Sequence, residues 1–197
     1  PLFIYAGTPE ATAGATQMFD WPLPTTEEAP YVVQDPKNPR WSYANSKALG
    51  EQAVIHNGVL EWIAVRPQNV YGPRQKDHFI SEFVARAKQD EFTVFGGVNT
   101  RTFLYIDDCV DALIKLWKTK SAHNDIYNLG GSTETAIHSV ASLLMELLKK
   151  KGELVIHPAP KGSVNRRWPD ITKIKNAIDW EPTTELAVGL GRTLETL

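Results

Sequence analysis

Residues 61–67 read Glu-Trp-Ile-Ala-Val-Arg-Pro, an apolar run that a proline closes. This pattern predicts a short strand. An earlier apolar run over residues 2–6 ends at Gly7 and predicts another strand, buried on both faces of a parallel sheet. Between the two lie a proline-rich loop over residues 20–40 and a predicted helix over 40–55. Strand, long connection, helix and strand are typical of a βαβ unit, so the two strands are expected to run parallel.

The rest of the chain continues this alternation, which predicts an α/β fold. Short apolar runs stopped by glycine pairs indicate strands, and apolar positions at helical spacing indicate helices. We expect strands over residues 93–95, 126–129 and 154–157, and helices over 79–88, 107–118, 137–151, 171–178 and 184–197.

Composition excludes several classes of partner. The chain has 197 residues and a formal net charge of −2, which is typical of a globular protein and gives no sign of a nucleic-acid surface. No apolar run approaches the ~20 residues that a membrane span needs, so no membrane partner is expected. The single cysteine, Cys109, cannot form a disulfide within the chain and is expected to be a buried thiol. A cytoplasmic location fits this composition.

Tyr43 and Lys47 form the strongest candidate for chemistry. They stand four residues apart in the predicted helix, which puts both side chains on one face. A phenol with a pKa of about 10 is a poor acid or base at neutral pH, and a nearby ammonium lowers that pKa by stabilising the phenolate. The same ammonium could donate to the ribose hydroxyls of a cofactor. By itself the spacing also fits two unrelated side chains on a solvated helix face.

Polar residues follow the predicted strands where each one ends. Thr8 and Glu10 come just after the first strand, and Asn69 follows the second. Ligands of open α/β sheets bind outside the carboxyl ends of the strands. These residues and the Tyr43–Lys47 helix are therefore expected to meet at one edge of a sheet.

The ordered set of motifs resembles the extended short-chain dehydrogenase/reductase family, which comprises nucleotide-sugar epimerases, dehydratases and decarboxylases. The resemblance covers nearly the whole chain, and the set is far more specific than any one motif. Asn38-Pro39-Arg40-Trp41 particularly resembles UDP-glucuronate decarboxylases. The motifs, in order, are a strand followed by Thr8, Tyr43-x-x-x-Lys47, Arg66-Pro-x-Asn-Val-Tyr-Gly-Pro73, Thr100-Arg-Thr-Phe-x-Tyr-Ile-Asp-Asp108, and Arg167-x-Pro-Asp-Ile-Thr-Lys173 with Trp180-Glu-Pro182.

The resemblance implies a fold and a division of the chain. The fold would be the C-terminal half of a Rossmann-like doubly wound parallel sheet plus a smaller mixed α/β substrate-binding domain. Residues 1–72 and 101–131 would form a partial NAD-binding domain. Residues 73–100 and 132–197 would form the nucleotide-sugar-binding domain.

The resemblance also implies a catalytic set and a nicotinamide pocket. Thr8 would hydrogen-bond the reacting oxygen of the sugar or the nicotinamide side, and Glu10 would be an active-site carboxylate. Tyr43 would act as the base that takes the proton of the sugar 4-hydroxyl. Lys47 would bind the nicotinamide ribose of NAD and tune the tyrosine, and the residues expected to line the nicotinamide pocket are Pro67 and Val70.

A second group of residues would hold the nucleotide-diphosphate sugar. Asn69 would contact the diphosphate. Arg101 and Arg167 would bind it, because a guanidinium group can donate two parallel hydrogen bonds to paired phosphate oxygens. Backbone groups of Thr93, Val94 and Phe95 would face the base. Without the resemblance, Asn69 could simply cap a turn and the two arginines could be surface ion-pair partners. No histidine has the spacing of a metal ligand, so no metal is expected.

Two features depart from the family pattern. The glycine-rich strand-turn-helix fingerprint that receives the pyrophosphate is absent, so this chain alone is not expected to bind NAD tightly and a truncated form is expected. Pro9 stands where 4,6-dehydratases carry an acidic proton donor, which argues against a dehydratase.

Three functions therefore remain open. The first is an NAD-dependent nucleotide-sugar epimerase that acts by transient oxidation at sugar C4. The second is a UDP-glucuronate decarboxylase-like enzyme, favoured by Glu10 and by Arg40-Trp41. The third is an inactive, incomplete domain that binds at most the sugar nucleotide. A homodimer through the Tyr43–Lys47 helix is possible, and exposed apolar surface is expected on that helix.

Overall fold

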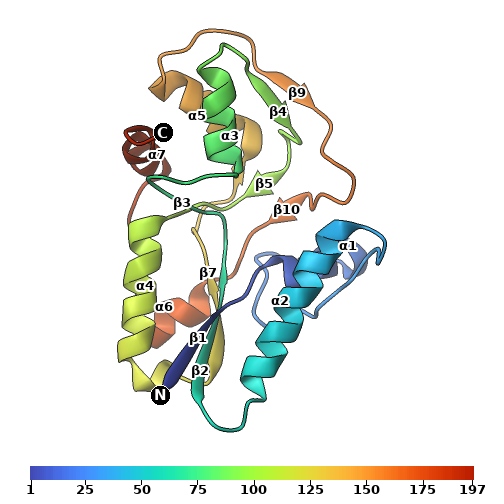
Figure 1. The fold of residues 1–197 in the computed structure, drawn as a ribbon, viewed down its shortest axis with the longest axis vertical. Helices are drawn as coiled ribbons and strands as arrows, with labels where there is room; N and C mark the ends of the chain where they lie inside the picture. The colour runs from blue at the N-terminus through green and yellow to red at the C-terminus, as the bar shows by residue number, and fades with distance from the viewer.

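The computed structural model describes residues 1–197 apart from the side chain of Arg40. Its centre is a parallel sheet in the order β1-β2-β7, formed by β1 (Leu2–Ala6), β2 (Glu61–Pro67) and β7 (Asp125–Leu129). The predicted βαβ unit is confirmed, with β1 and β2 joined through α1 (Glu10–Phe19) and α2 (Pro39–Ile55) (Figure 1). The parallel register brings the carboxyl ends of the strands, at Ala6 and Pro67, to one edge of the sheet.

Helices cover both faces of this sheet. In Figure 1, α2 lies on one side, and α4 (Ile106–Lys118) and α6 (Thr172–Ile178) lie on the other. Successive side chains of β2 point to opposite faces of the sheet. Ile63 and Val65 pack in the core that includes residues of α4, whereas Arg66 donates a hydrogen bond to Glu51 on α2. A short 3-10 helix, η1 (Lys120–Ala122), links α4 to β7.

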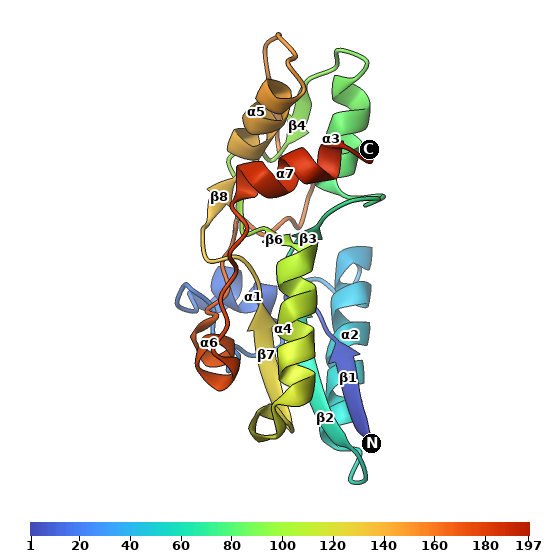
Figure 2. The same ribbon diagram turned by 90° about the vertical axis from the view of Figure 1, so that its left-hand side faces the viewer.

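The other part of the molecule has its own apolar core. Figure 2 shows this part stacked on the sheet part along the long axis, with α7 crossing above α4. Its core is made by aromatic and aliphatic residues of three helices and of strands next to them. Its elements are α3 (Phe79–Ala87), α5 (Ile137–Leu147), α7 (Leu186–Leu194), the pair β4 (Thr93–Phe95) and β9 (Val155–His157), and the sheet of β10 (Arg166–Arg167), β5 (Thr100–Arg101) and β8 (Thr135–Ala136).

The short pair β3 (Val70–Tyr71) and β6 (Leu104–Tyr105) lies where the two parts meet. The predicted division into two domains stays a prediction. However, α6, which that division groups with the smaller domain, packs in the sheet core through Ile174 and Ile178.

The prediction that the first strand is buried on both faces is wrong. β1 is the edge strand of the sheet, and Phe3 and Ile4 are 46% and 37% exposed. An apolar run does not reveal whether both faces and both edges of its strand are covered, because that depends on neighbours supplied by the tertiary structure. The expected apolar surface on α2 is confirmed, since Tyr43 and Leu49 are exposed.

The helices differ from the sequence-based expectation at two places. Residues 10–19 form α1, where no helix was predicted. The helix predicted over residues 137–151 is shorter, since α5 ends at Leu147. Asp107 and Asp108 lie in the first turn of α4. Asp108 accepts bonds from Thr183 and Thr184, which anchors the segment that leads into α7.

Cys109 is buried on α4, as expected, and burial raises the pKa of its thiol to about 11. A thiol of this kind stays protonated at neutral pH and is a poor nucleophile. Among the described residues, no helix combines the length and apolarity needed to cross a membrane.

Leu116→Ala should lower the free energy of unfolding by about 2–5 kcal/mol. Leu116 is fully buried in the sheet core, so its truncation removes apolar contact and leaves a cavity. Urea denaturation would measure the loss. The matched control on the same helix is Ile114→Ala, whose exposed side chain should change stability by about 0.5 kcal/mol or less. Equal losses for the two variants would contradict the described packing of α4.

Candidate active site

A cavity of about 400 Å³ opens at the carboxyl edge of the sheet, between the two parts of the molecule. This is the edge at which polar residues were expected to meet. Aromatic and aliphatic side chains form much of its wall. Its lining residues are Thr8, Pro9, Glu10, Tyr43, Pro67, Asn69, Val70, Tyr71, Gln75, His78, Phe79, Ile80, Phe103 and Arg167.

Thr8 reaches the cavity because β1 ends just before it. The amide of Gly7 still donates to the carbonyl of Val65 at 2.8 Å, which holds the end of β1 against β2. Thr8 is buried, and its Oγ1 accepts a bond from the amide of Glu10 at 3.3 Å. The hydroxyl is therefore fixed between the strand end and the first turn of α1.

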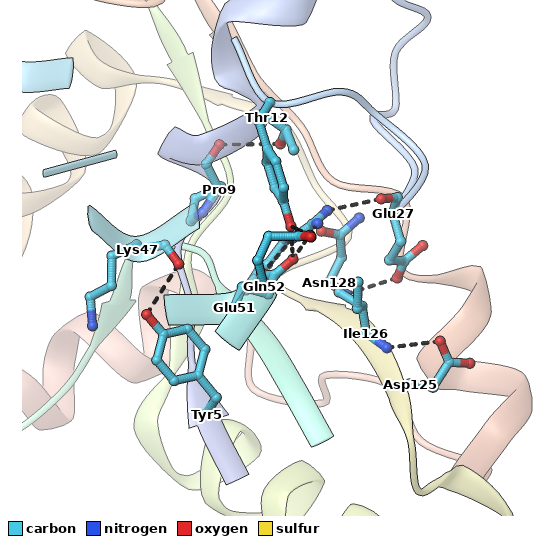
Figure 3. Close-up of polar contacts among 12 residues, drawn as sticks. Tyr5, Pro9, Thr12, Glu27, Lys47, Glu51, Gln52, Asp125, Ile126 and Asn128 are labelled. Carbon is cyan, nitrogen blue, oxygen red and sulfur yellow. Dashed lines mark hydrogen bonds and ion pairs between the residues drawn. The ribbon is translucent and has the colours of Figure 1, made fainter. Parts of the chain in front are cut away.

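Tyr43 and Lys47 approach the same strand end from α2. The exposed phenol of Tyr43 lines the cavity. Lys47 lies one helical turn after Tyr43, and its amine does not line the cavity. Instead, Nζ donates to the carbonyl of Ala6 at 3.0 Å. Tyr5 supports this end of the helix by donating its hydroxyl to the carbonyl of Lys47 at 3.1 Å (Figure 3). The structure thus brings Thr8, Tyr43 and Lys47 to one sheet edge.

Gly50 permits the contact between β1 and α2. A Cβ atom at this position would lie 2.2 Å from the hydroxyl oxygen of Tyr5, closer than any real contact. The absence of a side chain therefore allows Tyr5 to reach the carbonyl of Lys47.

Glu10 and Arg167 meet in the cavity as an ion pair, although 157 residues separate them in the sequence. Both side chains are largely buried, with 14% and 11% of their surfaces exposed. Glu10 comes from the first turn of α1 and Arg167 from β10, so the pair links the sheet part to the smaller sheet. It places a carboxylate and a guanidinium side by side in the cavity wall.

Arg101 and Phe95 lie apart from this pair. They line a neighbouring cavity of about 190 Å³, together with Asn69. Arg101 Nη1 donates to the carbonyl of Thr100 at 2.7 Å, and the exposed ring of Phe95 stacks on His157 at 5.3 Å. Asn69 borders both cavities, and its amide donates to the carbonyl of Thr102 at 2.7 Å. The predicted contact of Arg101 and Arg167 with one diphosphate would have to span both cavities.

Thr93 and Val94 line none of the cavities described here. Val94 is buried in the core of the smaller part, and the carbonyl of Thr93 accepts a bond from Arg86. The predicted backbone contacts of residues 93–95 with a base stay a prediction.

Sequence reasoning missed the wall that the smaller part contributes. Gln75, His78, Phe79 and Phe103 all line the large cavity, yet no role was predicted for any of them, although Phe103 belongs to the Thr100-to-Asp108 motif. The tertiary structure brings them there: Gln75, His78 and Phe79 come from the start of α3 and the segment that leads into it, and Phe103 comes from between β5 and β6. The Arg66-to-Pro73 motif was a partial signal, since Gln75 lies two residues after it.

Below the cavity lies a buried polar cluster, drawn in part in Figure 3. Its centre is the ion pair between Glu51 on α2 and Arg66 on β2. Tyr31 donates its hydroxyl to Glu51 at 2.6 Å, and Arg66 Nη1 donates to the carbonyl of Glu27 at 3.0 Å. Glu27 in turn accepts a bond from the amide of Asn128 at 2.8 Å. The cluster joins the loop after α1 to the sheet.

Glu27→Gln should raise stability at neutral pH. Burial raises the pKa of the Glu27 carboxyl above its ordinary value of 4.5, so the ionised group costs stability in the folded protein. A raised carboxyl pKa means that this cost disappears as pH falls through the folded-state pKa toward the unfolded value. Glutamine keeps an oxygen for the Asn128 amide and carries no charge. Urea denaturation should show a more stable variant at pH 7 and equal stabilities near pH 4; lower stability at pH 7 would contradict this account.

The sequence model of the NAD dependent epimerase/dehydratase family matches residues 1–130. The chain belongs to this family. It shares 30% identity with a UDP-N-acetyl-alpha-D-glucosaminuronate decarboxylase of Bacillus cytotoxicus, in an alignment that covers 98% of this chain and 62% of the relative. The chain therefore spans about three-fifths of the length of this relative of the epimerase/dehydratase family.

Solved structures of epimerases share the fold. The UDP-glucose 4-epimerase of Thermotoga maritima, determined with UDP-glucose, matches with a TM-score of 0.81 and 28% identity over 98% of this chain and 62% of that one. The UDP-glucuronic acid 4-epimerase of Bacillus cereus, determined with UDP-glucuronic acid and NAD, matches with a TM-score of 0.82 and 25% identity over 98% and 60%. The epimerase/dehydratase fold is thus common to enzymes with different sugars.

The family is NAD-dependent, and one end of the site fits that cofactor. Pro67 and Val70 offer an apolar wall next to Tyr43, which suits a flat nicotinamide ring, and Lys47 offers an ammonium for ribose hydroxyls at the same sheet edge. A glycine-rich turn for the pyrophosphate does not occur in the sequence. Among the described residues, no cluster of three or more histidine, cysteine or acidic side chains could hold a metal ion.

Proposed function

We propose that this chain carries the substrate-side half of an NAD-dependent nucleotide-sugar enzyme that oxidises the sugar at C4, as an epimerase does. The observation that supports the proposal most strongly is the meeting of Thr8, Tyr43 and Lys47 at one sheet edge, beside a cavity of about 400 Å³. A cavity of this size suits a small ligand. The nucleotide-diphosphate sugar would lie between the sheet edge and the smaller part.

Tyr43 is the proposed base. Its phenol lines the cavity, where it can take the proton of the sugar 4-hydroxyl while Thr8 donates a hydrogen bond to the same oxygen. Lys47 stabilises the phenolate by its positive charge. When bound, NAD+ supplies the hydride acceptor that turns the C4 alcohol into a ketone. The residues of this chain then return the proton from Tyr43 as the alcohol re-forms.

A decarboxylase is the second candidate, and the Glu10–Arg167 pair favours it. A 4-keto uronate loses its carboxylate readily, because the ketone lies beta to the carboxyl carbon. A guanidinium in the cavity wall can bind that carboxylate, and a carboxyl group beside it can handle the proton that C5 takes up. The Arg40 side chain, part of the decarboxylase-like motif, lies outside the described residues.

Turnover with product analysis tests both candidates. The chain would be incubated with NAD+ and, separately, with UDP-glucose, UDP-galactose and UDP-glucuronate, and products would be separated by chromatography and identified by mass. An epimerase yields an isomer of equal mass, whereas a decarboxylase lowers the mass by one CO₂. Glu10→Gln should slow formation of the decarboxylated sugar, because C5 loses its proton donor, but spare epimerisation. Because this chain alone is not expected to bind NAD tightly, NAD+ would be raised until the rate no longer depends on it. Absence of turnover with all three substrates under that condition would contradict the proposal.

Ligand titration tests the remaining alternative, an inactive and incomplete domain. Calorimetric titration with UDP-sugars and with NAD+ would be run on the same preparation. Binding of UDP-sugar without NAD+ would favour that alternative. Binding of both ligands supports the proposed enzyme.

A homodimer through α2 is part of the proposal, because Leu49 and Tyr43 leave apolar surface on that helix. Sedimentation velocity would show a dimer that Leu49→Glu dissociates.

A further inference from the structure

The buried ion pair of Glu51 and Arg66 lies where three elements of the site come closest. Arg66 precedes Pro67 at the end of β2, and Glu51 follows Lys47 by one helical turn on α2. The guanidinium holds both carboxylate oxygens, with Nε at 3.1 Å from Oε2 and Nη2 at 2.7 Å from Oε1. The two side chains are 1% and 2% exposed. This fork fixes the helix against the sheet in both position and direction.

The end of β1 lies against the same pair. A Cβ atom built on Gly7 would be 2.9 Å from Oε2 of Glu51 and 3.1 Å from the carbonyl of Val65. The backbone that leads into Thr8 therefore passes directly over the Glu51 carboxylate. Lys47 holds the same segment from above, through its bond to the carbonyl of Ala6.

The loop after α1 closes the pair off from water. Tyr31 donates its hydroxyl to Glu51, and its ring lies 5.7 Å from the guanidinium carbon of Arg66. Gln52 Nε2 donates a hydrogen bond to that hydroxyl oxygen at 3.2 Å (Figure 3). Every polar atom of the fork thus has a partner, which a buried pair requires if it is to hold one geometry.

We propose that Glu51 and Arg66 are positioning residues that set the placement of Thr8 and Lys47, and through Lys47's helix that of Tyr43. The inference rests on the proposed C4 oxidation. A buried ion pair adds little net stability compared with apolar side chains of similar size. The ion pair instead fixes geometry, because its hydrogen bonds require one relative position of α2 and β2. An apolar pair would fill the same space but would allow the helix to slide along the strand. Errors of about 1 Å in a reacting group cost roughly 10²-fold in rate.

Single and combined substitutions separate positioning from stability. Glu51→Ala or Arg66→Met leaves one charge buried and should lower Tm by roughly 10 °C. The combination of Glu51→Met, Arg66→Met and Tyr31→Phe removes the charges and the orphaned hydroxyl together, and should recover most of that loss. Arg66→Lys keeps the charge without the fork. Glu181→Gln, in the exposed pair with Lys175, is the neutral control.

The kinetic readout decides between the two roles. In the triple variant, kcat should stay down by roughly 10²-fold while KM for the nucleotide sugar changes by less than about threefold. Arg66→Lys should resemble it in kcat, because one ammonium cannot reproduce the fork. If kcat returns to the wild-type value together with Tm, the pair only stabilises the fold and the proposal is overturned.

Hydrogen exchange tests the inference without turnover. The amide of Gly7, which donates to Val65, and the amides of residues 43–50 should lose protection in the triple variant although Tm is recovered. Unchanged protection would overturn the positioning role. Absence of turnover in the wild-type chain would instead overturn the proposed function, and the exchange result would still stand by itself.

Discussion

Tyr43→Phe should lower kcat by about 10²–10⁴-fold, the usual contribution of a general acid or base. The substitution removes one hydroxyl from an exposed side chain that lines the cavity. It leaves α2 and the Lys47 bond to Ala6 untouched, so the fold should not change. KM for the nucleotide sugar should change little, because the hydroxyl takes part in proton transfer in the transition state rather than in binding the substrate.

Steady-state kinetics with the preferred nucleotide sugar and NAD+ would measure this loss. Tyr5→Phe is the matched control: it removes a phenol on the neighbouring strand that donates only to the carbonyl of Lys47. We expect that variant to retain kcat within about tenfold. If Tyr43→Phe keeps the wild-type kcat, the proposed base is wrong and Thr8 would have to be considered in its place.

Arg167→Met should have the second largest effect. It removes the guanidinium from the cavity and leaves the largely buried carboxylate of Glu10 without that partner. Loss of the guanidinium also removes its charged contact with an anionic group of the ligand, which is worth about 2–5 kcal/mol, so binding and turnover should both fall by at least roughly 10²-fold. Calorimetric titration with UDP-glucuronate and with UDP-glucose would measure the binding part.

Arg166 offers an adjacent control. It precedes Arg167 on β10 but is half-exposed and pairs with Glu134, outside the large cavity. Arg166→Met should therefore alter UDP-sugar affinity by less than about threefold. Equal losses for the two arginine variants would point to damage to β10 rather than to a role of Arg167 in the site. A loss confined to UDP-glucuronate would favour the decarboxylase.

Much of the fold could be predicted from local sequence pattern. The runs at residues 2–6 and 61–67 gave parallel strands, and Tyr43 with Lys47 lies on the expected helix. The helix at residues 10–19 was missed because Ala, Thr and Gly in its first half form no apolar stripe with a polar face. Its buried first half reflects packing against the loop that carries Val32, which no local pattern encodes.

The site divides in the same way. Thr8, Tyr43 and Asn69 could be named because strand ends and helix spacing place polar groups at predictable positions. The Glu10–Arg167 pair could not be predicted as a contact, since 157 residues separate its members. The Glu51–Arg66 fork was not anticipated either, although both residues belong to elements that were predicted.

The sequence by itself determined the parallel βαβ unit and the family, because strand runs, turn residues and ordered motifs are local properties. Only the tertiary structure decided that β1 is an edge strand, that α3 and Phe103 close the cavity, and that charges far apart in the chain meet beneath and beside it. The reason is physical: burial and charge pairing depend on distances between elements, and those distances are set when the two cores pack.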